Sequence, residues 1–191
     1  MRAIMIREVR ELRGHQSLET WMGKEYLTLG DLWPESPKAV VVGINPAPVS
    51  VGVGHYHQGT LGIRLSKRLT AAGVLPPNSA GFMDDVAMCE GLGFTDLVKR
   101  PTSRAAEIGA SEMTFGCDRL EREIAAREVP LVIFVFKAAA TQLLGKFPGN
   151  GLLEDHSVGG AAVFIMPGPY EAAASSNKTL VVLRELWLKN D

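Results

Sequence analysis

The sequence predicts an α/β protein: one three-layer α/β/α sandwich with a mainly parallel central sheet. Short apolar runs, such as residues 39–42 and 131–136, are bounded by turn residues, as buried parallel strands are. Longer segments between these runs carry apolar residues at helical spacing. Strands that alternate with helices over 191 residues are typical of a parallel sheet covered by helices on both faces.

The N-terminal part, residues 1–37 of the single domain 1–191, is expected to be a helical extension packed on the sandwich. Its candidate inward positions recur at roughly helical spacing and are Leu12, Leu18, Trp21 and Met22. Prolines at positions 34 and 37 then end the segment. The first strand of the sheet is predicted directly afterwards, over residues 39–42.

The remaining elements follow the same two patterns. In residues 62–72 apolar side chains fall on one helical face and basic ones on the other, which predicts a helix. Residues 83–90 are ambiguous, and residues 91–98 are expected to form a loop with a short extended piece. The later elements are predicted as a helix over 111–127, a strand over 131–136, a helix over 138–144, a strand over 161–166 and a helix over 177–188.

The composition favours a cytoplasmic protein without cofactors. Hydrophobic residues make up 46% of the chain and charged residues 21%, which suits one sizeable core. No apolar run is long enough to cross a bilayer, and no signal-type segment begins the sequence. Two cysteines are too few for a four-cysteine zinc site or an iron–sulfur cluster. A formal net charge of −1 gives no overall attraction to nucleic acid, so such contact would need a local basic face.

The most informative residue is Asn45, which follows the first predicted strand in the run Gly43-Ile44-Asn45-Pro46. Ligands of an open α/β sheet bind beyond the carboxyl ends of its strands. Pro46 and Pro48 stiffen the turn that would hold the amide there. A primary amide in this place can orient a water molecule or pair with a base edge. Asn-Pro also begins ordinary turns, so the run by itself leaves a structural role open.

Two blocks of sequence carry a family resemblance. The first is Gly43–Pro46, followed by Gly54–His57 and Arg64, and the second is Gly93–Thr102. In this order the blocks resemble the mismatch-specific uracil/thymine-DNA glycosylases, and the likeness runs from about residue 38 to the C-terminus. It implies the uracil-DNA glycosylase fold and an enzyme of base excision repair, which flips a base out of DNA and hydrolyses its bond to the sugar. The expected partner is double-stranded DNA with uracil or a mismatched guanine; no cofactor, metal or membrane is expected, and the protein should be monomeric and, in a bacterium, associated with the nucleoid.

The resemblance assigns roles by position. Asn45 matches the asparagine that positions the attacking water, and His57 matches the aromatic residue that stacks on the flipped base. Ser50 falls beside the pocket for the pyrimidine ring, where it leaves modest room near the fifth carbon and favours uracil over thymine. Ile44 and Tyr56 are expected to contact the base as well.

Asp96 falls at a position where the family varies between a lysine, an asparagine and an acid. We expect it to be catalytic, because a carboxylate near the water would add general-base help of roughly 10² to 10⁴ in rate. A carboxylate that caps or fixes a loop is the alternative. Asp84 and Asp85 are weaker competitors for the catalytic role and are better explained as turn or cap residues.

The rings of His55, Tyr56 and His57 lie among glycines and suit stacking against an extruded base, although the family normally has Phe or Tyr at position 57. Such a stacking histidine would make activity depend on pH near the imidazole pKa. An unliganded surface cluster and a metal site are the alternatives. A metal is disfavoured because His15 and His156 lack a convincing companion.

Contacts with DNA phosphates are expected from three basic residues and one turn: Arg64, Lys99, Arg100 and Gly168-Pro169-Tyr170. The turn aligns with the family's second motif but differs from it in sequence. Each basic residue could also be solvated surface, and the turn could simply connect a strand to a helix.

The leading interpretation is a monofunctional DNA glycosylase that removes uracil, or thymine and other damaged bases, opposite guanine and leaves an abasic site. One alternative is a catalytically weak or inactive family member that binds mismatched or abasic DNA. The other is an α/β protein that binds a free nucleoside or nucleotide, although the chain has neither a Gly-x-Gly-x-x-Gly motif nor a P-loop.

Overall fold

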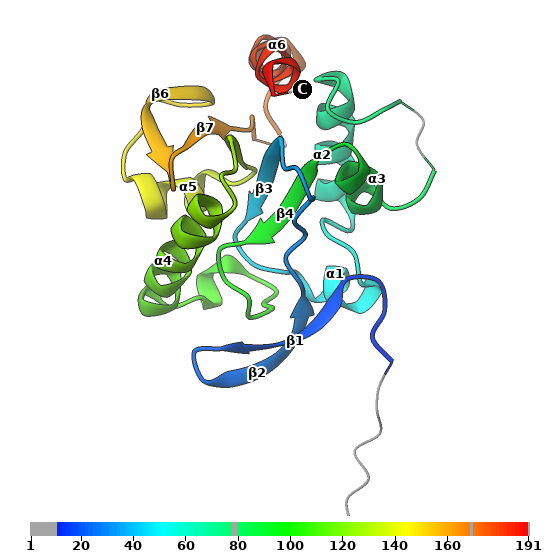
Figure 1. The fold of residues 1–191 in the computed structure, drawn as a ribbon, viewed down its shortest axis with the longest axis vertical. Coiled ribbons are helices and arrows are strands. Elements are labelled where there is room, and N and C mark those ends of the chain that lie inside the picture. Colours follow the sequence, from blue (N-terminus) through cyan, green and yellow to red (C-terminus); the bar gives the residue numbers. More distant parts are fainter. Residues whose placement is uncertain (1–10, 78–79, 169, 191) are drawn as a thin grey trace, which may run out of the picture.

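A five-stranded sheet lies between two layers of helices in the computed structural model, which describes residues 11–77, 80–168 and 170–190 (Figure 1). The elements are β1 (Gln16–Trp21), β2 (Lys24–Leu29), β3 (Ala39–Gly43), α1 (Pro48–Val53), α2 (Thr60–Ala71), α3 (Met83–Cys89), β4 (Leu92–Asp96), the short 3₁₀ helix η1 (Ala105–Glu107), α4 (Ala110–Ala126), β5 (Leu131–Phe134), α5 (Lys137–Leu144), β6 (Gly151–Val158), β7 (Ala161–Ile165) and α6 (Ala173–Lys189). The predicted three-layer α/β architecture is confirmed.

The sheet has the strand order β4-β3-β5-β7-β6, in which β6 alone among these strands runs antiparallel to its neighbour. The central strands β3 and β5 are buried along their whole length, which explains their uninterrupted apolar sequences. The chain leaves β3 toward β4 and then crosses to β5 on the other side of β3. This reversal of direction marks the carboxyl end of β3 as the expected ligand site.

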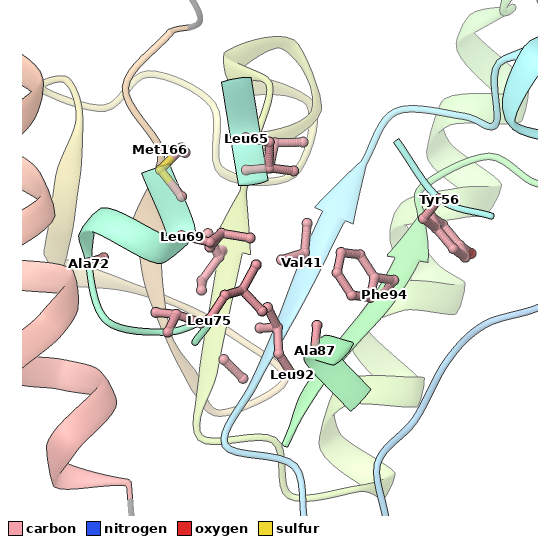
Figure 2. Close-up of a cluster of buried hydrophobic side chains, with 14 of the residues drawn as sticks. Val41, Tyr56, Leu65, Leu69, Ala72, Leu75, Ala87, Leu92, Phe94 and Met166 are labelled. Atoms are coloured by element: carbon pink, nitrogen blue, oxygen red, sulfur yellow. The ribbon is translucent and has the colours of Figure 1, made fainter. Parts of the chain in front are cut away.

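Alternation along the strands divides the core between the two faces of the sheet. Val41, Ile133 and Phe164 belong to the cluster that packs against α2, α3 and α6, part of which Figure 2 shows. Val42 and Phe134 belong to the cluster on the opposite face, beneath α4 and α5. Since both faces are covered, the functional groups are confined to the ends of the strands and the loops that follow them.

A β-hairpin occupies the described part of residues 1–37, so the predicted helical extension is wrong there, while residues 1–10 lie outside the described residues. Met22 and Gly23 both have positive φ, which gives the two-residue turn that joins twisted antiparallel strands. Of the four expected inward positions Trp21 is buried, whereas Leu18 is 58% exposed. The chain then continues along the edge of the sheet, where Leu32 pairs with Phe94 of β4.

Most of the other predicted elements are confirmed within a few residues, and the ambiguous segment 83–90 contains α3. Strand β6 and helix α1 were not predicted, and the short extended piece expected within residues 91–98 is the five-residue strand β4. Gly91 and Gly93 favour a loop in the sequence, but Gly93, within β4, has a packing role, because a Cβ there would crowd the carbonyl of Leu32. None of the described helices is long and apolar enough to span a membrane.

Candidate active site

A cavity of about 110 Å³ opens at the carboxyl ends of β3 and β4. Asn45, Asp96 and Phe136 line it from the segments at the ends of β3, β4 and β5. The segment from α1 to the start of α2 supplies the other main part of the lining: Ser50, Tyr56, His57, Gln58, Leu61 and Gly62. The structure therefore brings together the amide and the carboxylate that the sequence singled out, at the place where α/β sheets bind ligands.

The amide of Asn45 has a fixed orientation. Its Nδ2 donates to Oγ1 of Thr102 at 2.9 Å and lies 3.2–3.4 Å from the backbone carbonyl oxygens of Pro46, Arg100 and Thr102. The Thr102 hydroxyl in turn donates to the carbonyl of Arg104, so it accepts from Asn45. Because these partners take up the NH₂ side, the amide oxygen, which accepts no hydrogen bond from a described residue, is left to act on the cavity.

Asp96 is 3% exposed, and no described residue donates a hydrogen bond to its carboxylate. Burial is the main influence on this group and raises its pKa from 3.8 to about 7, against the opposing charges of Lys99 and Arg119 and with the support of Asp31. Near neutral pH the side chain is therefore present both as acid and as carboxylate. A loop-fixing carboxylate would be hydrogen-bonded to nearby donors, so that alternative does not fit this environment.

Gly43 makes room for the carboxylate. Strands β3 and β4 pair so that Gly43 lies beside Asp96 in the register. A Cβ built on Gly43 would overlap Oδ1 of Asp96. The first glycine of the Gly43–Pro46 motif is thus explained by the position of an acid on the neighbouring strand.

A network of paired charges surrounds Asp31, close to Asp96. Asp31 accepts from Nζ of Lys99 at 2.9 Å and from Oγ1 of Thr95 at 2.7 Å, and it pairs with Arg119 at 2.6 Å. The Lys99 side chain is 2% exposed, because its amine is enclosed in this network. The prediction that Lys99 contacts DNA phosphate is therefore wrong.

His57 lies where the main cavity meets a smaller one of about 30 Å³. Its φ of +52° is unusual for a residue with a Cβ, and its carbonyl packs so tightly on Gly62 of α2 that no larger residue would fit there. The ring lies 5.8 Å from that of Phe94, and its Nε2 is buried without a hydrogen-bond partner among the described residues. Burial lowers the pKa of His57 to about 4, so the expected titration of this ring near pH 6.5 is wrong.

Of the other residues predicted to contact the base, two line the cavity and one does not. Tyr56 and Ser50 line the cavity, and both are fixed by hydrogen bonds: the Tyr56 hydroxyl donates to the carbonyl of Gly30, and Ser50 Oγ accepts from the backbone N–H of Gln58. The side chain of Ile44 instead packs into the core cluster beneath α4 and α5, and it does not line the cavity. Its contact with a base therefore stays a prediction, in which only its backbone could take part.

Two of the predicted phosphate contacts adjoin each other at the surface. The guanidinium of Arg64, on α2, lies 4.6 Å from the ring centre of Tyr170, which is 79% exposed. The adjacent Gly168 donates its backbone N–H to Glu171, which shapes the turn after β7. Pro169 lies outside the described residues. These contacts link α2 to the turn beside the smaller cavity, which is lined by Arg68 and Pro167.

Arg100 does not present a free charge. Its Nη2 lies 2.8 Å from Oε2 of Glu112, and its Nε donates to the same carboxylate, a two-pronged pairing that raises the pKa of Arg100. Its contribution to the site is the backbone carbonyl near Asn45. Phe136, in contrast, was missed in the sequence, although it ends the predicted buried strand 131–136 and the same strand-end reasoning would have found it.

Comparison with known proteins gives the family. Residues 30–189 match the sequence model of the Uracil DNA glycosylase superfamily. No individual curated protein was found to match the chain. The matched region includes the Asn45 turn and the strand that carries Asp96, and it begins after the hairpin of β1 and β2. The chain therefore belongs to the uracil DNA glycosylase superfamily, whose members are DNA glycosylases, hydrolases that act in DNA repair.

Proposed function

We propose that this protein is a monofunctional glycosylase that removes uracil paired with guanine from double-stranded DNA and leaves an abasic site. The observation that carries the proposal is the convergence of Asn45 and Asp96 on one cavity at the carboxyl ends of β3 and β4. The mismatch-specific branch of the superfamily is proposed on the two sequence blocks that lead to these residues. The cavity is small, as a site for one extruded pyrimidine should be.

Asn45 acts on the attacking water through its oxygen. Since its NH₂ group is held by the loop after β4, the amide cannot easily rotate, and its oxygen accepts a hydrogen from water in a fixed direction. An amide is a poor proton acceptor, so it orients the water without deprotonating it. Another group must therefore accept the proton that the attacking water loses.

Asp96 takes that proton and stabilises the sugar. In the proposed step the bond between the base nitrogen and C1′ breaks, the base leaves with the electron pair, and the sugar becomes cation-like. The water oxygen then bonds to C1′ while its proton passes to the carboxylate. A negative charge in a poorly hydrated cavity also attracts the developing cation more strongly than it would in bulk water. With a pKa of about 7, Asp96 is a base matched to neutral pH.

The absence of a suitable amine supports simple hydrolysis. Strand cleavage through a Schiff base needs a lysine amine at the sugar. No lysine in the described part of the chain lines the cavity, and the nearby Lys99 is engaged with Asp31. We therefore expect the sugar–phosphate backbone to remain intact.

The rings around the cavity provide surfaces for the flipped base. Tyr56, His57 and Phe136 all line it, and aromatic faces stack on any base. A neutral His57 stacks without adding charge. Ser50, packed against the backbone of Gln58, leaves limited room beside the ring, so we expect uracil to be preferred over thymine.

The test is release of the base from labelled duplexes that contain U, T or hypoxanthine opposite G or A, measured in a single turnover. We expect the fastest release from U opposite G, with strand breaks that appear only after alkali treatment. Breaks without alkali would contradict the monofunctional mechanism. Binding of the duplex without any release would instead indicate an inactive DNA-binding member of the superfamily.

A further inference from the structure

Four potential metal ligands converge outside the cavity. His15 precedes β1, His55 follows α1, and Asp84 and Asp85 lie at the start of α3, so three segments distant in the sequence meet. One ligand atom from each residue lies within 4.8 Å of the others. None of the four lines the cavity of Asn45 and Asp96. The expectation that His15 has no companion is wrong, because it lies beside His55 with ring centres 5.0 Å apart.

The donor atoms of the four residues lie close enough together to surround one ion. His15 Nε2 lies 2.7 Å from Asp85 Oδ1 and 3.8 Å from Asp84 Oδ2. His55 Nδ1 lies 3.0 Å from Asp84 Oδ1 and 3.8 Å from Asp85 Oδ2. Four ligands at the usual zinc–nitrogen and zinc–oxygen distances would be about 3.3 Å from one another. The four separations draw on both oxygens of each carboxylate and lie on both sides of that value. With one oxygen taken from each carboxylate, all four ligand atoms lie within 4.8 Å of one another, so shifts of the side chains would close them around one ion.

The surroundings hold these ligands in place from outside. Asp84 has no exposed side-chain surface and accepts the backbone N–H of Tyr56 at 2.7 Å, and the His55 ring stacks on Phe82 with centres 3.6 Å apart. Such support for ligands is typical of metal sites. Two adjacent carboxylates, one of them enclosed, also carry negative charge that a cation would neutralise. Asp85 is half-exposed and gives the ion a route of entry.

The backbone brings the histidine segments together independently of the ligands. The N–H of His15 donates to the carbonyl of Gly54 at 2.7 Å. Gly14 and Gly54 both have positive φ, and a Cβ on Gly14 would crowd both that carbonyl and the His55 ring. Glycine at both positions therefore permits the close approach that places the two imidazoles side by side.

We propose that His15, His55, Asp84 and Asp85 bind one divalent transition-metal ion, of which zinc best suits two imidazole nitrogens and two carboxylate oxygens. The ion is structural: it ties the start of the hairpin and the start of α3 to the loop that delivers Tyr56 and His57 to the cavity. Magnesium and calcium prefer sites made of oxygen ligands, so they should bind weakly here.

The test is metal binding by the full chain after dialysis against a chelator, with Zn²⁺ added alone and its affinity measured by competition with a chromophoric chelator. We expect one ion per chain and, at a free concentration about 100 times Kd, a rise in Tm of roughly 5–10 °C. Co²⁺ should give the visible absorption of a four-coordinate ion. Absence of stoichiometric Zn²⁺ binding, or equally tight binding of Ca²⁺, would overturn the proposal.

Matched variants locate the site. His15→Gln and Asp85→Asn change partly exposed ligands with little change in shape, and each should weaken Zn²⁺ binding by at least about 100-fold. His156→Gln and Asp155→Asn, on β6 outside the cluster, are the controls and should bind as the unaltered protein does. If the two pairs of variants bind Zn²⁺ equally well, the ion is elsewhere and the assignment is wrong. Circular dichroism of each variant verifies that it is folded.

Discussion

Two acids of this protein, the partly buried Asp31 and the buried Asp96, have opposite environments. Burial alone would raise the pKa of Asp31, but the charges of Lys99 and Arg119 and hydrogen bonds from Thr95 and Lys99 outweigh it and lower that pKa. Asp96 lies near the same cations, yet burial dominates and raises its pKa to about 7. The difference follows from direct contact: Asp31 is hydrogen-bonded to its cations, whereas they act on the Asp96 carboxylate from a distance.

The contrast is the one expected between a structural acid, Asp31, and the catalytic acid that we propose Asp96 to be. A carboxylate with partners can hold elements together, as the partly buried Asp31 does between the segment after the hairpin, β4 and α4. A buried carboxylate without partners lowers stability at neutral pH, because its charged form is poorly solvated. An acid kept in that state beside an oriented amide is best explained by chemistry, since function is where proteins retain unfavourable local arrangements.

The substitution Asp96→Asn tests this difference between the two acids most directly. Base release in a single turnover should fall by about 10² to 10⁴, because the general base is lost. Stability should change in the opposite direction. The folded-state pKa is raised, so the unaltered protein loses stability as pH rises from about 4 to about 7, and at pH 8 the variant should be more stable by at most about 4 kcal/mol.

Urea unfolding at pH 4 and pH 8 tests this pair of effects. The two proteins should differ little at pH 4, where the carboxyl is protonated in the folded state and still about half protonated in the unfolded chain, and most at pH 8. Unchanged base release would remove Asp96 from the mechanism, and a variant destabilised at pH 8 would show that the carboxylate has partners after all.

A second comparison uses two glycines that differ in what surrounds them. Gly43→Ala should displace the carboxylate of Asp96, and a shift of about 1 Å in a catalytic group can lower activity by about 10²-fold. Gly52, in α1, has open space around its Cβ position, so Gly52→Ala should leave base release unchanged and raise helix stability by up to about 1 kcal/mol. Equal activity of the two variants would contradict the packing of Gly43 against Asp96.

The sequence was sufficient to predict the three inner strands of the central sheet, β3, β5 and β7, and the convergence of Asn45 with Asp96. Both residues directly follow or end a buried strand, and the carboxyl ends of parallel strands meet at one edge of the sheet. The hairpin was not predicted, because its sequence has apolar residues at intervals that also fit a helix. Its turn requires Met22 to adopt a left-handed backbone conformation, and a methionine in the sequence does not indicate that conformation.

The status of Lys99 and of the His15 cluster could not be read from the sequence for a different reason. Whether a lysine faces solvent or an ion network depends on residues distant in the chain, here Asp31. His15 and Asp85 are likewise 70 residues apart yet lie in contact. Spacing along the chain reveals local contacts, so sites assembled from three distant segments need the fold.

The substitution Lys99→Met removes one of the two cations that pair with Asp31, and so tests the difference between Asp31 and Asp96 from the other side. Breaking a buried ion pair costs about 3–5 kcal/mol, and urea unfolding should show a loss of this order. Because the charge of Lys99 lowers the pKa of Asp96, its removal should raise that pKa further, and the acid limb of the activity profile should move to higher pH. The salt dependence of DNA binding should stay the same. A slope reduced by about one would instead show that Lys99 reaches a phosphate.

The smallest effect is expected from His57→Phe, measured as the pH profile of base release. Activity should decrease below a midpoint near pH 7, since Asp96 must be ionised, and fall about tenfold for each further pH unit. His57 stays neutral throughout this range because its pKa is about 4, so phenylalanine should leave the midpoint where it is. Phenylalanine can stack as histidine does, and it removes a buried nitrogen that has no partner among the described residues. A midpoint displaced by this change would show that the imidazole, and not the acid on β4, sets the pH dependence.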